Sequence, residues 1–362
     1  MAREKGPKRE RRPRTRGQKI RRGILIGVAV AVAVTGGVAA WGYTHLQGNL
    51  KSIDIDKAVG PDRPAQLPSG GQDILVLGSD SRSGLNGDVI GQHEDIGARS
   101  DTAMVVHIPK GRNSAVVVSI PRDTLVDRPA CTTPQGRQLP AAHGVMFNSI
   151  FSVGGPPCTV KAVEKMTGLR MDHYVEIDFS GFKGLVDAMG GVDITVPQAI
   201  HDKYTNLDIP AGTSKLDGTQ ALAFVRTRYS VGDGSDLGRI QMQQQFLFSV
   251  LTQLRASDAL TDPVKLYRIG DAATRAITTD SDLGSLTSLL DFVRSMKGLN
   301  AGTLQTVMMP VVYDTAHYGR VDPAQPQDSE LWQALRNDRP IPASARTSPA
   351  HGTVNTGTAN GG

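Results

Sequence analysis

The hydrophobic positions of residues 73–309 follow two alternating periods. Short β-branched runs predict strands at residues 73–78, 102–108, 115–120, 174–178, 192–196 and 304–309. Segments with apolar residues three or four positions apart predict helices at residues 158–169, 182–189, 240–254 and 283–296. The polar segment 109–113 predicts a hairpin between the second and third strands. Strands that alternate with helices indicate an α/β sheet covered on both faces.

A different pattern precedes this region, because residues 23–43 contain no charged side chain. Twenty-one helical residues span about 30 Å, which matches the hydrocarbon core of a bilayer. Trp41 and Tyr43 fall where an interfacial aromatic belt is expected. The pattern predicts a transmembrane anchor. A cleaved signal peptide with its cleavage site near Val38 and Ala40 is the alternative, and either one exports the rest of the chain.

Charge is distributed unevenly along the chain. The formal net charge is +5, yet residues 1–22 alone hold eleven Lys or Arg and two Glu, which leaves 29 basic and 33 acidic residues elsewhere. Basic residues before an apolar span predict a cytoplasmic N-terminus. We therefore expect a single-pass protein of the cell membrane with an extracytoplasmic domain. The acidic balance of that domain argues against a nucleic-acid partner.

Composition divides the chain into five parts. Residues 1–22 form a basic cytoplasmic segment and residues 23–43 the anchor. Residues 44–71 end in a run rich in Pro, Gly and Ser, and we interpret them as an extracytoplasmic stalk. Residues 72–338 form the main folded domain. Residues 339–362 are mostly small and polar, which predicts a disordered tail.

The chain contains two cysteines, Cys131 and Cys158. An even number of cysteines in an exported protein favours a disulfide. Two unrelated free thiols are the alternative. The chain has no third Cys, and neither a metal pair nor a catalytic thiol is indicated.

Polar clusters flank the predicted strands, and these carry the candidate chemistry. They lie at residues 78–82, 99–102, 121–124, 225–228 and 236–244. Every cluster contains arginine, and four of them also contain aspartate. Solvated strand ends or structural Arg–Asp ion pairs explain any single cluster. Five such clusters together favour a binding site.

Arginine and aspartate suit a phosphate ligand with a metal ion. Guanidinium groups bind phosphate oxygens two at a time. Arg226 and Arg228 are two positions apart, so on a strand both side chains would point to one face and favour an anion such as pyrophosphate between them. Asp80 and Asp101 adjoin predicted strands, and Mg²⁺ is commonly held by one or two carboxylates with phosphate oxygens.

These motifs resemble those of the LytR-CpsA-Psr family of bacterial cell-wall proteins, in an actinobacterial form. The resemblance covers about two thirds of the chain and rests on DILVLGSDSR at 73–82, RSDT at 99–102, SIPRDT at 119–124, VRTR at 225–228 and DLGRIQMQQ at 236–244. It implies a three-layer α/β/α fold with a central mixed sheet and an apolar cavity for a polyprenyl chain. It also implies a disulfide between Cys131 and Cys158.

The resemblance assigns roles to individual residues. The residues implied to bind pyrophosphate are Arg99, Arg122, Arg226, Arg228, Arg239 and Gln243. Asp80 and Asp101 are implied to bind Mg²⁺ or Mn²⁺, and we take Arg122 and Asp236 as the catalytic pair. Met242 departs from the family, which often has arginine there, and the lysine common before the asparagine at Asn148 is absent.

The implied activity is that of a phosphotransferase. It would move a glycopolymer from a polyprenyl-pyrophosphate carrier to peptidoglycan through a phosphodiester link, with membrane lipid as a further partner. Two alternatives use the same site. One is hydrolysis of the polyprenyl pyrophosphate by water, and the other is a lipid-binding scaffold without turnover.

Overall fold

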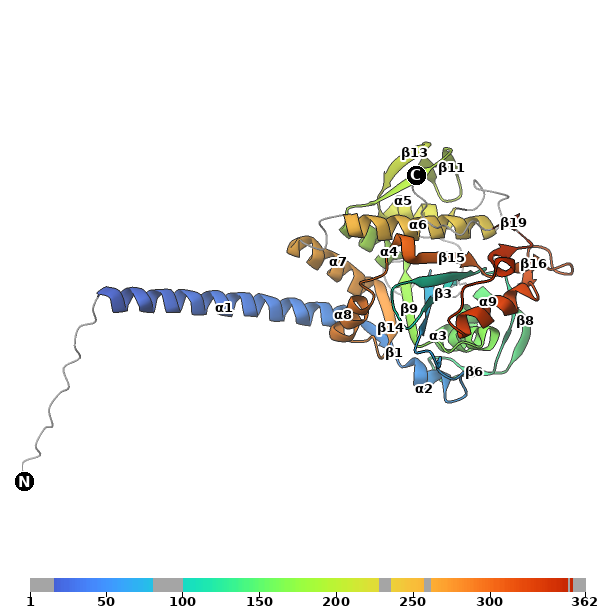
Figure 1. Cartoon of the computed structure of the whole chain (residues 1–362), viewed down its shortest axis with the longest axis horizontal. Helices are drawn as coiled ribbons and strands as arrows, with labels where there is room; N and C mark the ends of the chain where they lie inside the picture. Colours follow the sequence, from blue (N-terminus) through green and yellow to red (C-terminus); the bar gives the residue numbers. More distant parts are fainter. Residues whose placement is uncertain (1–15, 81–99, 228–235, 257–261, 351, 354–362) are drawn as a thin grey trace, which may run out of the picture. The chain divides into compact units, whose positions relative to one another are not determined.

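A computed structural model describes residues 16–80, 100–227, 236–256, 262–350 and 352–353 of the chain. The chain divides into two units, Met1–Gly48 and Asn49–Gly362. Helix α1 (Arg16–Asn49) includes the predicted anchor at residues 23–43 (Figure 1). Within the described residues, we find no helix that is both long and apolar enough to cross a bilayer.

Seven strands of the described residues form one mixed sheet in the second unit (Figure 1). Their order across the sheet is β1 (Lys51–Ile53), β14 (Ile277–Asp280), β9 (His173–Asp178), β2 (Gln72–Ser79), β3 (Ser100–Ile108), β4 (Ala115–Ile120) and β15 (Leu304–Met308). The pairs β1/β14, β2/β9 and β4/β15 are parallel, and β2/β3, β3/β4 and β9/β14 are antiparallel. The hairpin predicted around residues 109–113 is confirmed.

The strand directions create one polar edge. Strands β2, β9, β4 and β15 run the same way, so their C-terminal ends lie together with the start of the antiparallel strand β3. We call this the carboxyl edge, and it comprises the ends at Ser79, Asp178, Ile120 and Met308 and the start at Ser100. Ligands of α/β sheets bind beyond such strand ends.

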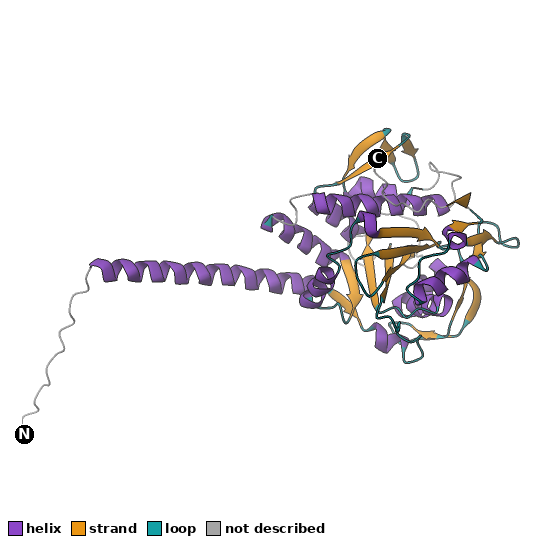
Figure 2. Ribbon diagram, viewed as in Figure 1, coloured by secondary structure: helices purple, strands orange, loops and turns teal. Residues whose placement is uncertain are grey.

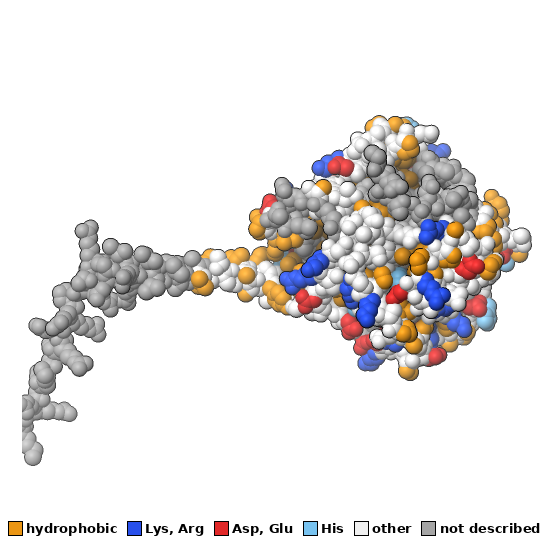
Figure 3. Space-filling view, viewed as in Figure 1, with side chains coloured by type: hydrophobic (Ala, Val, Ile, Leu, Met, Phe, Trp, Pro, Cys, Tyr) orange, Lys and Arg blue, Asp and Glu red, His pale blue; other side chains and the backbone are white. Residues whose placement is uncertain are grey.

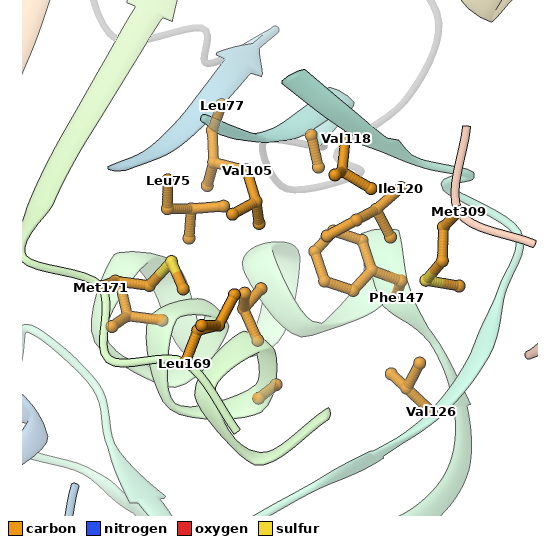
Figure 4. Packing of buried hydrophobic residues seen from close by; sticks show 14 of the residues in the cluster. Leu75, Leu77, Val105, Val118, Ile120, Val126, Phe147, Leu169, Met171 and Met309 are labelled. Carbon is orange, nitrogen blue, oxygen red and sulfur yellow. The ribbon is translucent and has the colours of Figure 1, made fainter. Parts of the chain in front are cut away.

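The first face of the sheet is covered by α2 (Ile55–Val59), α3 (Phe147–Thr167) and α9 (Gln327–Arg336). Successive strand residues point to opposite faces, so Leu75 and Leu77 lie on this side. Figure 4 shows Leu75, Leu77, Val105 and Ile120 above α3. A fully buried side chain of this size contributes about 1.5–3 kcal/mol.

The second face is covered by α6 (Asp236–Ala256) and α8 (Leu286–Ser295), with α4 (Phe179–Met189), α5 (Gly218–Arg226) and α7 (Pro263–Ala276) beside them. Val76 and Met104 point to this side and pack with Leu247 and Phe292. Helices therefore lie on both sides of the strands (Figure 2). The predicted α/β fold with a central mixed sheet is confirmed.

Further short strands lie outside the main sheet. They pair as β5 (Leu125–Arg128) with β8 (Ala142–Met146), β6 (Cys131–Thr132) with β7 (Gln138–Leu139), β10 (Val192–Val196) with β13 (Gly212–Leu216), β11 (Ile200–Asp202) with β12 (Leu207–Ile209), β16 (Val311–Tyr313) with β17 (Val321–Pro323), and β18 (Thr347–Ser348) with β19 (Gly352–Thr353). Among the described residues, 3₁₀ turns span Ala301–Thr303 and Ala343–Arg346. The β10/β13 and β11/β12 ribbons share a core with α4, α5 and α6.

The predicted stalk is wrong from residue 51 onward. Strand β1 joins the main sheet through β14, and Ile55 and Val59 are only 4% and 5% exposed. The guanidinium of Arg63 binds the buried Glu164 carboxylate, with Nη2 2.6 Å from Oε1. The segment 61–71 is therefore fastened to α3. The sequence pattern did not predict this packing, because the apolar stretches of residues 51–71 are short and are interrupted by Pro and Gly.

The tail prediction also needs correction in its first part. Ile341 is 2% exposed and Ala345 is fully buried, because both side chains join the core beneath α9. Residues 354–362, the end of the predicted tail, lie outside the described residues. Two isolated apolar side chains within a polar segment produce no recognisable period, yet they are enough to hold the segment against the core.

The helix predicted at residues 158–169 starts earlier than the sequence pattern indicates. Helix α3 begins at Phe147 rather than residue 158, and it contains a break at Gly155, where φ is 67°. Pro156 and Pro157 follow this break. Proline fits the first turn of a helix, so the second half of α3 begins anew after Gly155. The predicted stop at Gly168 is confirmed, since this residue caps α3 in the left-handed conformation.

The disulfide between Cys131 and Cys158 is confirmed, and the alternative of two free thiols is wrong. It joins β6 to α3 with a Cα–Cα distance of 5.4 Å. Both cysteines are buried within the first core. The bond thus fastens the loop that carries β6 and β7 to the helix after its break.

We expect the double variant Cys131→Ala/Cys158→Ala to have a free energy of unfolding about 3–4 kcal/mol lower than that of the wild type. The reason is that the wild-type cross-link, which spans 27 positions, restricts the unfolded chain. Urea unfolding of the second unit, monitored by circular dichroism without reductant, measures this difference. Added reductant should bring the wild type to the level of the variant. Equal midpoints for both proteins without reductant would contradict the prediction.

Candidate functional site

A cavity of about 260 Å³ lies between the second face of the sheet and helices α4, α5 and α6. Its wall is almost wholly apolar. The sheet contributes Val76, Met104 and Ile177, and the helices contribute chiefly Phe182, Leu185, Met189, Leu222, Phe246 and Val250. Gly78 and Thr102 line the cavity where it approaches the carboxyl edge. The cavity therefore joins an apolar interior to the polar end of the sheet.

Local sequence signals place α4 and α5 over this cavity. Asp178 caps α4 by accepting a hydrogen bond from the Gly181 N–H at 2.7 Å. A Cβ atom at Gly181 would lie 2.6 Å from the Ala276 Cβ, so glycine allows α4 to approach α7 closely. The Gly218 N–H donates to Asp187 Oδ1 at 2.7 Å and ties the start of α5 to α4.

Gln243 connects three elements at the polar end of the cavity. Its side chain is 7% exposed, and Nε2 donates to Thr102 Oγ1 at 2.7 Å and to the Val225 carbonyl at 3.2 Å. These bonds join α6 to β3 and to the last turn of α5. A buried donor with two acceptors fixes the relative positions of these elements.

Arg226 lies beside the same bonds, but not on a strand as the sequence pattern predicted. It is the last residue of α5, and Thr227 resumes an extended conformation. A capping box of Asp217 and Gln220 starts the helix, and this local signal outweighs the alternating residues at 225–228. The same-face argument for Arg226 and Arg228 is therefore wrong, and Arg228 lies outside the described residues.

The Arg226 guanidinium stacks on an aromatic ring of the cavity wall. Its Cζ lies 5.0 Å from the centroid of the Phe179 ring. A guanidinium over a ring is held by the cation–π attraction, which is about 0.5–1 kcal/mol at exposed sites and larger when desolvated. A cation thus stands at the boundary between the apolar cavity and the carboxyl edge.

Helix α6 points its N-terminus toward the carboxyl edge. Gln243 contacts Thr102 near this edge, whereas Leu247 and Leu251 pack in the core that contains Ile74, further along the sheet. Arg239 lies one turn before Gln243 on the same helical face and is 3% exposed. Asp236 is the first residue of α6, and its side chain lies outside the described residues.

Arg122 follows β4 at the carboxyl edge in a tight turn. Thr124 Oγ1 donates to the Pro121 carbonyl at 2.7 Å, and the Asn148 N–H donates to the Arg122 carbonyl at 3.1 Å. The start of α3 therefore fixes the backbone of this arginine. Arg122 Nε lies 3.5 Å from the Asp123 carboxylate. Arg320 Nη1 lies at the same distance, 3.5 Å, from this carboxylate.

The two predicted metal ligands belong to neighbouring strands. Asp80 directly follows β2. The register of β2 and β3 shifts between Gly78, opposite Thr102, and Ser79, opposite Ser100, so Asp101 is the extra residue of a β-bulge. The side chain of Asp101 lies outside the described residues, as does all of Arg99. Within the described part of the chain, no group of three or more His, Cys, Asp and Glu side chains is placed to hold a metal ion.

The carboxyl edge thus collects Asp80, Arg122, Arg226, Arg239 and Gln243 from four separate regions of the sequence. The sequence pattern missed Thr102 and Phe179 as parts of the site. Thr102 belongs to a cluster that we recognised for its arginine and aspartate only. Phe179 resembles an ordinary core residue until its contact with Arg226 is known.

The comparison with protein families identifies these motifs as those of one family. The model of the LytR_cpsA_psr family matches residues 42–337, which include the sheet, the cavity and the carboxyl edge. The chain belongs to this family.

Relatives within the LytR_cpsA_psr family bear names that refer to the cell wall. The cell wall biosynthesis protein LcpA of Corynebacterium glutamicum is 29% identical over 84% of this chain, which spans 62% of the length of that relative. The polyisoprenyl-teichoic acid–peptidoglycan teichoic acid transferase TagT of Bacillus subtilis is 29% identical over 76% of this chain and 81% of its own length.

Solved structures show the same family fold. A LytR-Csp2A-Psr enzyme from Actinomyces oris has a TM-score of 0.58 and 24% identity, and the match covers 79% of this chain and 95% of that one. The TagT structure from B. subtilis has a TM-score of 0.55 at 24% identity, and it covers 80% of this chain and 98% of that one. These similarities establish the fold.

Met242, where the resemblance led us to expect arginine, belongs to a hydrophobic core. The Met242 side chain is 4% exposed and packs in the core beneath the β10/β13 ribbon. It points away from the cavity wall formed by its neighbour Gln243. In this family member, position 242 therefore supports the ribbon.

We expect Gln243→Leu to lower the free energy of unfolding by about 1–3 kcal/mol, because the substitution removes a donor from a buried pair of acceptors. Gln245→Leu is the matched control, since its bond to the Thr195 carbonyl is exposed, and we expect a change within about 0.5 kcal/mol. Chemical unfolding measures both. Equal effects of the two substitutions would contradict the role of Gln243.

Proposed function

We propose that this protein is a membrane-anchored phosphotransferase that moves a glycopolymer from a polyprenyl-pyrophosphate carrier to peptidoglycan. The observation that carries the proposal is the junction of an apolar cavity with a polar sheet edge, at which arginines lie in the turn after β4, at the end of α5 and in α6. The names of the relatives LcpA and TagT support a role in wall assembly. In this proposal, residues 23–43 anchor the protein in the cell membrane.

The cavity would hold the prenyl chain. Its wall offers aliphatic and aromatic side chains from both the sheet and the helices, with polar groups only toward the carboxyl edge. Transfer of hydrocarbon from water to such a wall is favourable by about 0.8 kcal/mol for each buried CH₂ group. A prenyl chain in the cavity would place its pyrophosphate beside Thr102, Gln243 and Arg226.

The carboxyl edge would hold the pyrophosphate. Arg122, Arg226 and Arg239 lie on different elements at or near this edge, and in this proposal their charges act together on the ligand. We assign Arg99, in the motif that contains Thr102, and Arg228, in the motif that contains Arg226, to the same ligand. The N-terminus of α6 adds the positive end of a helix dipole, which favours phosphate.

Asp80 and Asp101 would hold Mg²⁺ or Mn²⁺ through carboxylate oxygens. Their positions on adjoining strands, with Asp101 in a bulge, fit a small oxygen-rich site that phosphate oxygens complete. When bound, the ion neutralises negative charge on the phosphate oxygens.

The reaction we propose has balanced bonds. An acceptor hydroxyl oxygen of peptidoglycan attacks the phosphorus that carries the glycopolymer, and the bond from this phosphorus to the bridging oxygen breaks. Polyprenyl phosphate leaves, and the hydroxyl proton passes to a carboxylate, for which we propose Asp236. The arginines stabilise the charge that develops on the phosphate oxygens, while Gln243 and Phe179 hold the surrounding elements in place.

Arg122→Ala should reduce glycopolymer transfer at least 100-fold, because it removes a positive charge at the reacting phosphates. The protein should stay folded, because the side chain that is removed is only half-buried. The measurement is transfer of a radiolabelled lipid-linked glycopolymer to peptidoglycan by the full chain in detergent.

Arg128→Ala is the control for this experiment, because its guanidinium binds the Pro140 carbonyl on an exposed ribbon. Its transfer rate should equal that of the wild type. A wild-type rate in Arg122→Ala would contradict the proposal. If the wild type releases free glycopolymer phosphate and forms no acceptor product, the activity is hydrolysis instead. If the wild type shows no turnover at all, the protein is a lipid-binding scaffold.

A further inference from the structure

A second depression lies on the opposite face of the sheet, at the same carboxyl edge. This cleft has a volume of about 440 Å³. Its walls come from β1, β9 and β14, from the turn between β6 and β7, and from α3 at its break. Its lining includes Lys51, Gln135, Ser152, Val153, Glu176 and Asp178.

Strand β9 separates the cleft from the apolar cavity. Ile177 lines the cavity, whereas its neighbours Glu176 and Asp178 line the cleft, as the alternation of a strand requires. Asp178 pairs with Ser79, the residue directly before Asp80. The cavity and the cleft therefore lie on opposite faces of the same strand ends.

The cleft combines polar and apolar groups. Carboxylates, a hydroxyl and an amide come from Glu176, Asp178, Ser152 and Gln135, and the side chain of Val153, which is 44% exposed, adds an apolar surface. Tyr174 Oη donates to Glu176 Oε2 at 2.9 Å and orients that carboxyl group. Burial raises the pKa of the Glu176 carboxyl. Hydroxyl groups with apolar C–H faces between them, as in sugars, match such a wall.

The walls of the cleft are held in place before any ligand binds. The Cys131–Cys158 disulfide fastens the β6/β7 ribbon to α3, and Arg137 Nη2 donates to the Val153 carbonyl at 3.1 Å. A Cβ atom at Gly154 would lie 2.5 Å from Cys158 Sγ, so this glycine allows the helix to approach the disulfide. A preformed cleft loses little entropy when it binds a ligand.

We propose that this cleft binds the acceptor, a glycan strand whose sugars carry hydroxyl and acetamido groups. The inference rests on the proposed function and deepens it. The lipid-linked donor approaches the carboxyl edge from the second face of the sheet, and the acceptor approaches from the first. The acceptor hydroxyl then reaches the pyrophosphate past the end of β9, beside Asp80.

The test measures acceptor binding directly, using the full chain in detergent and a soluble peptidoglycan disaccharide–tetrapeptide as the probe. Saturation-transfer difference NMR reports the contact between sugar protons and protein. Val153→Trp fills the cleft, and Glu176→Gln replaces the oriented carboxyl. Each should reduce the sugar signal at least fivefold. Val312→Trp is the matched control, because Val312 is 37% exposed on β16, away from the cleft, and should leave the signal unchanged.

Thermal unfolding establishes that each variant is folded, and binding of a polyprenyl phosphate, which should be unchanged in Val153→Trp, shows that the donor site is intact. The proposal is overturned if the wild type gives no sugar signal or if folded Val153→Trp retains it in full. Failure of the proposed function looks different, because glycopolymer transfer would then be absent in a wild-type protein whose cleft still binds the sugar probe.

Discussion

The common direction of β2, β4 and β9 is the constraint on which the site depends. Because these strands run the same way, the residues that follow them meet at one edge, although long stretches of sequence separate Asp80, Arg122 and Asp178. Antiparallel β3 begins at this edge and contributes Thr102. Polar groups at the strand ends are compatible with an apolar interior, because the strand residues before these ends supply the apolar side chains of the cores on both faces of the sheet.

The helices of the second face convert this edge into a site with two chemical environments. Gln243 fixes α6 against β3 and α5, and Phe179 supports the Arg226 guanidinium at the rim of the cavity. In the proposed function, the apolar wall behind them holds a hydrocarbon chain and the arginines hold its charged end. On the face seen in Figure 3, basic and acidic side chains are interspersed over the folded unit.

The sequence predicted what local patterns encode. Strands β2, β3, β4 and β9 agree with the β-branched runs, the disulfide agrees with the even pair of cysteines, and the family agrees with the order of its motifs. The sequence pattern assigned Arg226 to a strand, because polar and apolar residues alternate over residues 225–228. The signal for a helix, the capping box that starts α5, lies further upstream. The sequence pattern also missed β1 in the supposed stalk, since a three-residue edge strand depends on its partner β14 rather than on its own pattern. The cavity and the cleft unite residues from distant elements, and only the tertiary structure brings these together.

The central claim is that the apolar cavity holds the prenyl chain of the donor. Native mass spectrometry of the full chain, purified from bacterial membranes in mild detergent, tests it most directly. We expect wild-type protein to carry a polyprenyl phosphate or pyrophosphate and folded Met104→Trp, whose indole fills the cavity, to lack it. The same lipid mass bound to both proteins, or to neither, would contradict the account.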